Sequence, residues 1–158
     1  MISEQQSLPS VDLQTMTENG PIALNGDQLF KGKKVVLFAV PGAFTPTCSA
    51  AHLPGYVALA EELKAKGVDE IYCTSVNDVF VMHAWGQASG SSDVTMLADG
   101  NGKFAMSLGL DMDAQGFNMG TVRSKRYAMI VDDGIVTHLA IDAKGLDQSS
   151  AEAVLAKL

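Results

Sequence analysis

The sequence predicts an α/β fold in which a central mixed β-sheet is flanked by helices on both faces. Two observations lead to this prediction. Stretches of strand-like and helix-like pattern alternate along the chain, which is typical of helices packed on a sheet. Near the C-terminus, two apolar runs are separated by the turn "DDG" at 132–134, which indicates an antiparallel hairpin. We therefore expect one sheet with both parallel and antiparallel strands.

The first strand and helix are predicted within residues 33–67. "KKVVLFAV" at 33–40 is an apolar run rich in β-branched residues, which favours a strand covered on both faces. The stretch 50–67 has apolar residues at helical spacing, and Gly67 would end this helix as a C-terminal cap. Pro54-Gly55 is expected to kink or interrupt the helix near its first turns.

The remaining strands and helices are predicted within residues 70–158. We expect strands at 70–76 and 94–98, helices at 79–88, 104–108 and 149–158, a loop at 109–125, and a hairpin of 126–131 with 135–141. Asn77 or Asp78 would cap the helix at 79–88. A βαβ start followed by a ββα end is the layout of thioredoxin-like folds, and this is the architecture we predict.

Length, composition and charge limit the class of protein. The 158 residues, 47% of them hydrophobic, suffice for one domain over residues 1–158. A net charge of −7 without a run of lysine or arginine argues against nucleic acid as a partner. No apolar run approaches the roughly 20 residues that a membrane-spanning helix needs. The polar start lacks a targeting pattern, so we expect a cytoplasmic protein without a membrane partner.

The chain has two cysteines, Cys48 and Cys73. Two are too few for a disulfide framework. The three histidines are scattered along the sequence, so we expect no four-ligand zinc site, no other metal and no cofactor. Each cysteine is therefore either a buried structural thiol or a reactive one.

The sequence around Cys48 favours a reactive thiol. Thr45 followed by Pro46 suits a helix N-cap followed by proline at the first helical position. Cys48 would then lie in the first helical turn, where free N–H groups and the helix dipole favour a thiolate. A lone cysteine is more often a small buried hydrophobe, so this position alone leaves both interpretations open.

A longer pattern resembles the peroxidatic motif of the peroxiredoxins. "PGAFTPTC" places Pro41, Thr45 and Cys48 in the spacing Pro-x-x-x-Thr-x-x-Cys, directly after the first core strand. With "SVNDVFVMHAWG" and "KRYAMIVDDGIV", the chain from about residue 22 to 140 resembles the type-five subfamily, which includes the plant type II enzymes. This resemblance implies a thiol peroxidase that reduces hydrogen peroxide and alkyl hydroperoxides through a sulfenic acid at Cys48.

The resemblance also implies roles for the residues around this cysteine. Thr45 would turn its hydroxyl toward the thiolate and the bound peroxide, and Pro41 would shield the thiolate from water. The backbone N–H of Cys48 would help to hold the peroxide. Arg126 would keep the thiol ionised and polarise the peroxide oxygens. Arg123 is the neighbouring arginine that could be confused with it.

His52 and Cys73 are secondary candidates. His52 would either hydrogen-bond within the pocket or satisfy local backbone groups. Cys73 is the only internal thiol that could resolve the sulfenic acid, because the C-terminal segment contains none. Strand alternation places Cys73 in the sheet interior, where a thiol is usually inert. Pairing with Cys48 would require local unfolding, because a disulfide needs Cα atoms within about 7 Å.

An external thiol is therefore the simpler reductant. Glutathione, with or without glutaredoxin, fits the resemblance; thioredoxin or a disulfide between two chains stays open. The resemblance also suggests a homodimer.

Two other functions are compatible with the fold. A dithiol oxidoreductase of the thioredoxin kind would need Cys-x-x-Cys, but Thr45 stands where the first cysteine would be. A redox-sensing binding protein oxidised at Cys48 without turnover would use the same residues as the peroxidase.

Overall fold

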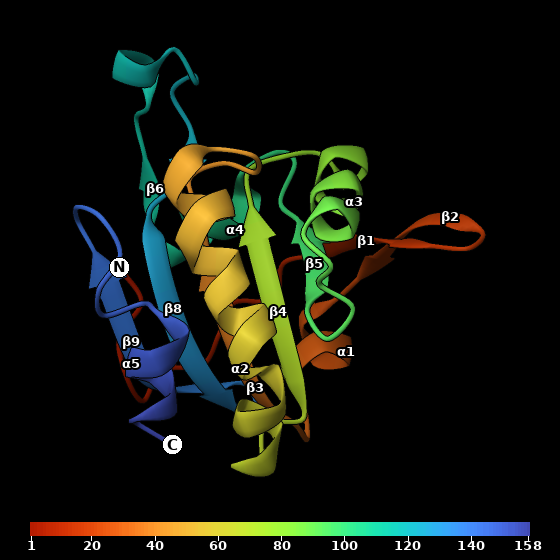
Figure 1. Ribbon diagram of the computed structural model, residues 1–158, viewed down its shortest axis with the longest axis vertical. Coiled ribbons are helices and arrows are strands. Elements are labelled where there is room, and N and C mark those ends of the chain that lie inside the picture. Colours follow the sequence, from red (N-terminus) through yellow and green to blue (C-terminus); the bar gives the residue numbers. More distant parts are fainter.

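The computed structural model describes residues 1–158 and contains one seven-stranded sheet, in the order β2-β1-β5-β4-β3-β8-β9 (Figure 1). The central strands β3, β4 and β5 are parallel, whereas the outer ones pair antiparallel. The strands are β1 (Leu13–Thr17), β2 (Gly20–Leu24), β3 (Lys34–Ala39), β4 (Glu70–Ser75), β5 (Thr95–Ala98), β8 (Arg126–Asp132) and β9 (Ile135–Asp142). The predicted mixed sheet is confirmed.

Helices cover both faces of the sheet, as predicted. Helices α2, α3 and α5 pack on one face, and α1 and α4 pack on the other (Figure 1). Their bounds are α1 (Gly26–Phe30), α2 (Leu53–Ala65), α3 (Val79–Ala88), α4 (Lys103–Leu108) and α5 (Ala151–Leu155). The two faces form separate apolar cores, and both cysteines belong to the core under α2, α3 and α5. None of the helices has the length and apolar character needed to cross a membrane.

Strand β3 lies in the middle of the sheet and leads directly to the loop before Cys48. Residues 35–39 are fully buried, because helices cover both faces of a central parallel strand. Burial of each large apolar side chain contributes about 1.5–3 kcal/mol. In the β3–β4 register Phe38 lies opposite Cys73. The end of β3 is therefore a rigid support for the segment that follows it.

The helix after β3 contains a widened turn. The backbone is helical from Pro46, and residues Cys48–His52 form a π-helical turn, η1, in which the N–H of Leu53 donates to the carbonyl of Cys48. Pro54 has no N–H to donate and its ring crowds the carbonyl four residues earlier, which favours such a local widening. The expected interruption exists, but it lies just before Pro54-Gly55 rather than at these residues.

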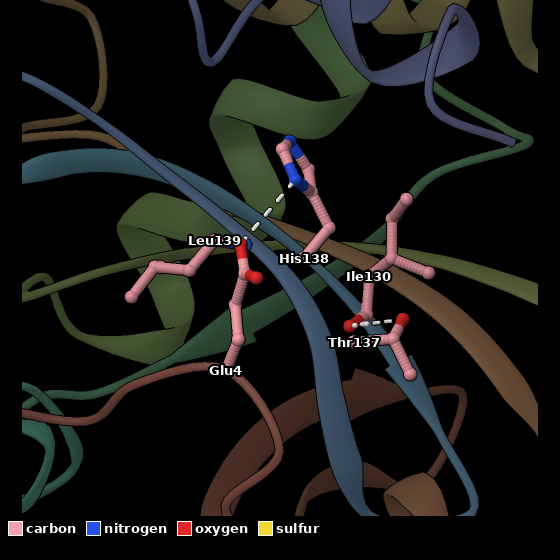
Figure 2. Close-up of polar contacts among 5 residues, drawn as sticks. All are labelled: Glu4, Ile130, Thr137, His138 and Leu139. Carbon is pink, nitrogen blue, oxygen red and sulfur yellow. Dashed lines mark hydrogen bonds and ion pairs between the residues drawn. The ribbon is translucent and has the colours of Figure 1, made fainter.

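The hairpin at the C-terminal side of the sheet is confirmed. Asp133 and Gly134 both have positive φ, 50° and 81°, as a two-residue type I′ turn requires. The register shifts between Ile130 and Val131. Thr137 lies at this shift and its hydroxyl donates to the carbonyl of Ile130 at 3.2 Å (Figure 2). Because of this bulge, the side chains of β9 that follow Thr137 alternate between the two faces of the sheet in the opposite phase to those before it.

The N-terminal part of the sheet was not predicted. The β1–β2 hairpin projects beyond the body of the domain (Figure 1), and most of its residues are exposed or half-buried. Its apolar pattern is therefore faint. The segment before β1 runs along the free edge of β9, where Glu4 accepts from the N–H of Leu139 at 3.3 Å and approaches His138 Nδ1 at 3.7 Å (Figure 2).

The stretch 109–125, expected as a loop, contains further structure. It forms a two-stranded sheet of β6 (Asp111–Met112) and β7 (Arg123–Ser124), with a 3-10 turn, η2 (Gln115–Phe117), between them. This arm extends beyond the end of the main sheet where β4 terminates (Figure 1). Neither strand exceeds two residues, so no periodicity could indicate them.

Candidate active site

Cys48 lies in the first turn of the helix that follows β3, as the sequence predicted. The first hydrogen bond of this helix joins the N–H of Ser49 to the carbonyl of Thr45 at 2.9 Å. The N–H groups of Thr47 and Cys48 precede that bond, and such groups favour an anion. Cys48 itself is fully buried. Its sulfur is therefore held at a position that stabilises negative charge and excludes water.

The hydroxyl of Thr45 contacts the sulfur. Its Oγ1 lies 2.9 Å from Cys48 Sγ and 2.6 Å from the carbonyl oxygen of Gly42. The helix begins after Thr45, but no backbone N–H donates to the hydroxyl, so the expected side-chain cap is not formed. One hydroxyl has a single proton, and it can be donated to the thiolate or to the carbonyl.

Arg126, the first residue of β8, is the cation at the sulfur. It is 9% exposed, and its Nη2 donates to Cys48 Sγ at 3.0 Å. A guanidinium stays charged when buried and favours the thiolate form of a neighbouring cysteine. Arg123 has a different environment: its Nε and Nη1 donate to the carbonyls of Met119 and Val76 at 2.9 and 3.2 Å. The structure thus separates the two arginines.

His52 lies within the pocket and contacts both Arg126 and the backbone. Its Nε2 is 2.9 Å from the carbonyl oxygen of Ser149, which can only accept, so Nε2 carries the proton. Nδ1 then accepts from Arg126 Nη1 at 2.7 Å. Burial, and secondarily the charge of Arg126, lowers the pKa of His52 to about 4. At neutral pH an uncharged imidazole therefore orients the guanidinium.

This shift makes the stability of the protein depend on pH. His52 has an ordinary pKa of 6.5 when unfolded and about 4 when folded, so between these values the unfolded chain binds more protons. The free energy of unfolding should therefore fall by about 3 kcal/mol as pH decreases from 7 to 4 on account of this group. Urea unfolding at several pH values measures it.

The matched comparison is His52→Gln against His83→Gln, which changes an exposed histidine. The first variant should lose this part of the pH dependence, and the second should keep it. An acid slope that is the same in wild type and His52→Gln would contradict the assignment of a neutral, buried His52.

Two further contacts hold the segment around Cys48, and the sequence did not indicate them. The indole N–H of Trp85, a core residue of α3, donates to Ser49 Oγ at 2.9 Å. Asn77 Oδ1 accepts from the N–H of Ala43 at 3.0 Å, whereas Asp78 caps α3 by accepting from the N–H of Val81. Of the two predicted caps, Asp78 is therefore the one used.

Pro41 and Cys73 occupy different surroundings. Pro41 is half-buried in the loop that also carries Thr45, and its shielding role stays a prediction. Cys73 is fully buried in β4, in the same core as Cys48, and both are free thiols. Burial, followed by the negative charge of Cys48, raises the pKa of Cys73 well above its ordinary value, and Arg126 opposes this. Cys73 is a protonated and poorly nucleophilic thiol in this conformation.

Fold and site together define a thioredoxin-fold protein in which the surroundings of one thiol, Cys48, favour its reaction as a nucleophile. No group of three or more histidine, cysteine or acidic residues is arranged to hold a metal ion. The family model described as Redoxin matches residues 3–155.

Curated relatives and solved structures agree with this class. Peroxiredoxin-2E-2, chloroplastic, of Oryza sativa is 53% identical over 135 residues, which cover 83% of this chain and 60% of the relative. Peroxiredoxin-2B of Arabidopsis thaliana is 51% identical over 132 residues, 82% of this chain and 81% of the relative. A crystal structure of reduced Prx3 from Vibrio vulnificus in complex with H₂O₂ superposes with a TM-score of 0.96 at 55% identity, over 99% of both chains.

The chain belongs to the Redoxin family and, within it, to the peroxiredoxins, the class of thiol peroxidases to which its sequence motif pointed. It spans less than two thirds of the length of the rice relative. The predicted thioredoxin-like fold is confirmed by the same comparisons.

Proposed function

We propose that this chain reduces hydrogen peroxide and small organic hydroperoxides at Cys48, and that an external thiol such as glutathione, with or without glutaredoxin, regenerates the cysteine. One observation carries the proposal. Thr45 Oγ1 and Arg126 Nη2 both lie within 3.0 Å of Cys48 Sγ, at a helix start where backbone N–H groups are free. The complex of the related Vibrio protein with H₂O₂ supports hydrogen peroxide as the substrate.

The contacts around Cys48 support the following oxidative step. The Cys48 thiolate attacks one peroxide oxygen, an S–O bond forms and the O–O bond breaks. Cys48 loses two electrons and becomes a sulfenic acid, while the other oxygen leaves as water or an alcohol after gaining a proton. Arg126 and the backbone N–H of Cys48 stabilise the negative charge that moves onto the leaving oxygen. Thr45 orients the peroxide through its hydroxyl.

The surroundings of the cysteines favour an external reductant. A thiol attacks the sulfenic sulfur, an S–S bond forms and water leaves; a second thiol then releases Cys48 and carries away the disulfide. Cys48 is fully buried, so the first helical turn must open for this step. Cys73 would have to leave the interior of β4 and ionise as well. A soluble thiol reacts without this exposure and ionisation of Cys73.

Cys73→Ser should therefore keep peroxidase turnover with glutathione and glutaredoxin within about twofold of the wild type, because the external route does not use the Cys73 thiol. Steady-state consumption of hydrogen peroxide measures this, with thioredoxin and its reductase as the alternative reductant. Loss of turnover in Cys73→Ser, with a disulfide between the two cysteines in the wild type, would overturn the external route. Oxidation of Cys48 once, without turnover with any thiol, would indicate the redox sensor instead.

We further propose that two copies associate at the end of the molecule that carries Cys48. Phe44 (54%), Phe80 (64%) and Phe117 (78%) are exposed in the segments that follow β3 and β4 and in the arm between β6 and β7, and exposed apolar side chains contribute to interaction surfaces where they adjoin one another. Sedimentation analysis should give twice the chain mass of 16.6 kDa; a monomer at micromolar concentration would contradict it.

The cytosol is the proposed location, because a thiol that must be returned to its reduced form suits a reducing compartment.

A further inference from the structure

A carboxylate outside the site is bound by a short loop next to it. Asp142 ends β9, and its two oxygens accept four hydrogen bonds from the loop that follows. The donors are the N–H groups of Asp147 (3.0 Å), Gln148 (3.0 Å) and Ser149 (2.9 Å) and the hydroxyl of Ser149 (2.6 Å). Three of these bonds converge on Oδ2 and the bond from Gln148 ends on Oδ1, so both carboxylate oxygens are engaged by the loop.

This arrangement fixes the carbonyl group of Ser149. Ser149 is fully buried, and its carbonyl oxygen accepts from His52 Nε2 at 2.9 Å and from the hydroxyl of Tyr56 at 2.8 Å. Tyr56 is itself held by stacking on Phe38 of β3, with ring centroids 3.9 Å apart. The loop bound by Asp142 thus supplies the acceptor that keeps the proton of His52 on Nε2 and leaves Nδ1 free for Arg126.

Asp142 also lies directly opposite Arg126 in the β8–β9 ladder. Opposite residues of an antiparallel pair project from the same face, with Cβ atoms about 5 Å apart, so an ion pair would be the ordinary outcome. Instead the guanidinium contacts His52 and Cys48, and the carboxylate contacts the loop. A carboxylate without those four donors would attract the guanidinium away from the sulfur.

We propose that Asp142 is a positioning residue for the thiol: it fixes the Ser149 carbonyl, and through His52 it directs Arg126 to Cys48. This inference rests on the proposed function of Cys48 as the reacting thiol. Partial burial acts to raise the pKa of Asp142, but the four hydrogen bonds together hold this pKa below its ordinary value, so the group stays ionised at neutral pH.

The ionisable groups around this chain of contacts come from several elements. Arg126 belongs to β8, His52 to η1 and Tyr56 to α2, and Glu152 of α5 acts on Tyr56. The charge of Asp142 acts to raise the pKa of His52, but burial and Arg126 outweigh it. His52 therefore stays neutral. The orientation of its imidazole, rather than its charge, makes the position of Arg126 depend on the position of the loop.

The test compares Asp142→Asn with Asp147→Asn, in the Cys73→Ser background so that only one thiol reacts. Each change removes one negative charge, from the end of β9 and from the loop that follows it respectively, but the side chain of Asp147 is exposed and makes no contact with the site. In Asp142→Asn an NH₂ group replaces one acceptor oxygen and faces N–H donors. The measurements are the rate of Cys48 alkylation by iodoacetamide against pH, and the second-order rate with hydrogen peroxide.

In Asp142→Asn we expect the pH of half-maximal alkylation to rise by about one unit and the peroxide rate to fall about tenfold. Asp147→Asn should match the parent in both. Ser149→Ala, which removes the 2.6 Å bond but keeps the carbonyl, should give a smaller shift in the same direction and serves if Asp142→Asn does not fold.

Alkylation profiles that are identical in Asp142→Asn, Ser149→Ala and Asp147→Asn, in a protein whose parent reacts with peroxide, would overturn the role of Asp142. A parent whose Cys48 is alkylated but never reacts with peroxide would instead overturn the proposed function.

Discussion

Cys48→Ser is expected to abolish thiol-dependent peroxide consumption, a fall of at least about 1,000-fold to the uncatalysed background. Serine fits the fully buried position of Cys48 but its hydroxyl does not ionise at neutral pH, so Arg126 and Thr45 would surround a group that cannot attack a peroxide. Hydrogen peroxide consumption with glutathione and glutaredoxin measures the effect.

The control is the same substitution at the other cysteine. Cys73→Ser also replaces a sulfur by an oxygen in the core beneath α2 and α3, so it makes the same substitution at a cysteine that the proposed chemistry does not use. Residual turnover in Cys48→Ser equal to that in Cys73→Ser would show that the oxidised group is elsewhere.

Arg126→Gln is expected to have the second-largest effect. In this variant the second-order rate constant for the reaction with hydrogen peroxide should fall about 100-fold. Glutamine keeps a hydrogen-bond donor but loses the charge that now lies 3.0 Å from the sulfur. Both the thiolate and the charge developing on the leaving oxygen would be less stabilised. Stopped-flow measurement of the reduced protein at pH 7 gives the rate directly.

Arg123→Gln is its matched control, since the same charge is removed three residues earlier. The guanidinium of Arg123 donates to the carbonyls of Met119 and Val76 rather than to Cys48, so its loss should change the rate by less than about threefold. Equal losses in the two variants would indicate that net charge near the site, and not the contact of Arg126 with the sulfur, controls reactivity.

The sequence was most informative where local patterns determine structure. The continuous apolar run of β3 reflects burial on both faces, and the DDG turn reflects the need for positive φ at Asp133 and Gly134. The Thr45-Pro46 pair predicted that Cys48 lies in a first helical turn. The choice of Arg126 over Arg123 came from the resemblance, and strand alternation explains it, because Arg126 shares its face of β8 with Ala128 and Ile130 of the Cys48 core.

Contacts between distant parts of the chain could not be predicted in this way. Ser149 lies 97 positions from His52, and a backbone carbonyl leaves no sequence pattern that would indicate its partner. The resemblance predicted that the hydroxyl of Thr45 turns toward the sulfur, and the structure has this contact; the side-chain cap that the Thr45-Pro46 pair also suggested is not formed. The β1–β2 hairpin escaped detection because its side chains are largely exposed.

The most direct measurement is to find where the first oxidation occurs. Reduced protein is mixed with one equivalent of hydrogen peroxide in the presence of dimedone, which traps sulfenic acids, and the adduct is located by mass spectrometry. We predict that the adduct forms on Cys48 alone within the time in which the peroxide is consumed, and that it is absent from Arg126→Gln over the same interval. An adduct on Cys73, or peroxide that remains unconsumed with Cys48 reduced, would contradict the assignment of Cys48 as the peroxidatic thiol.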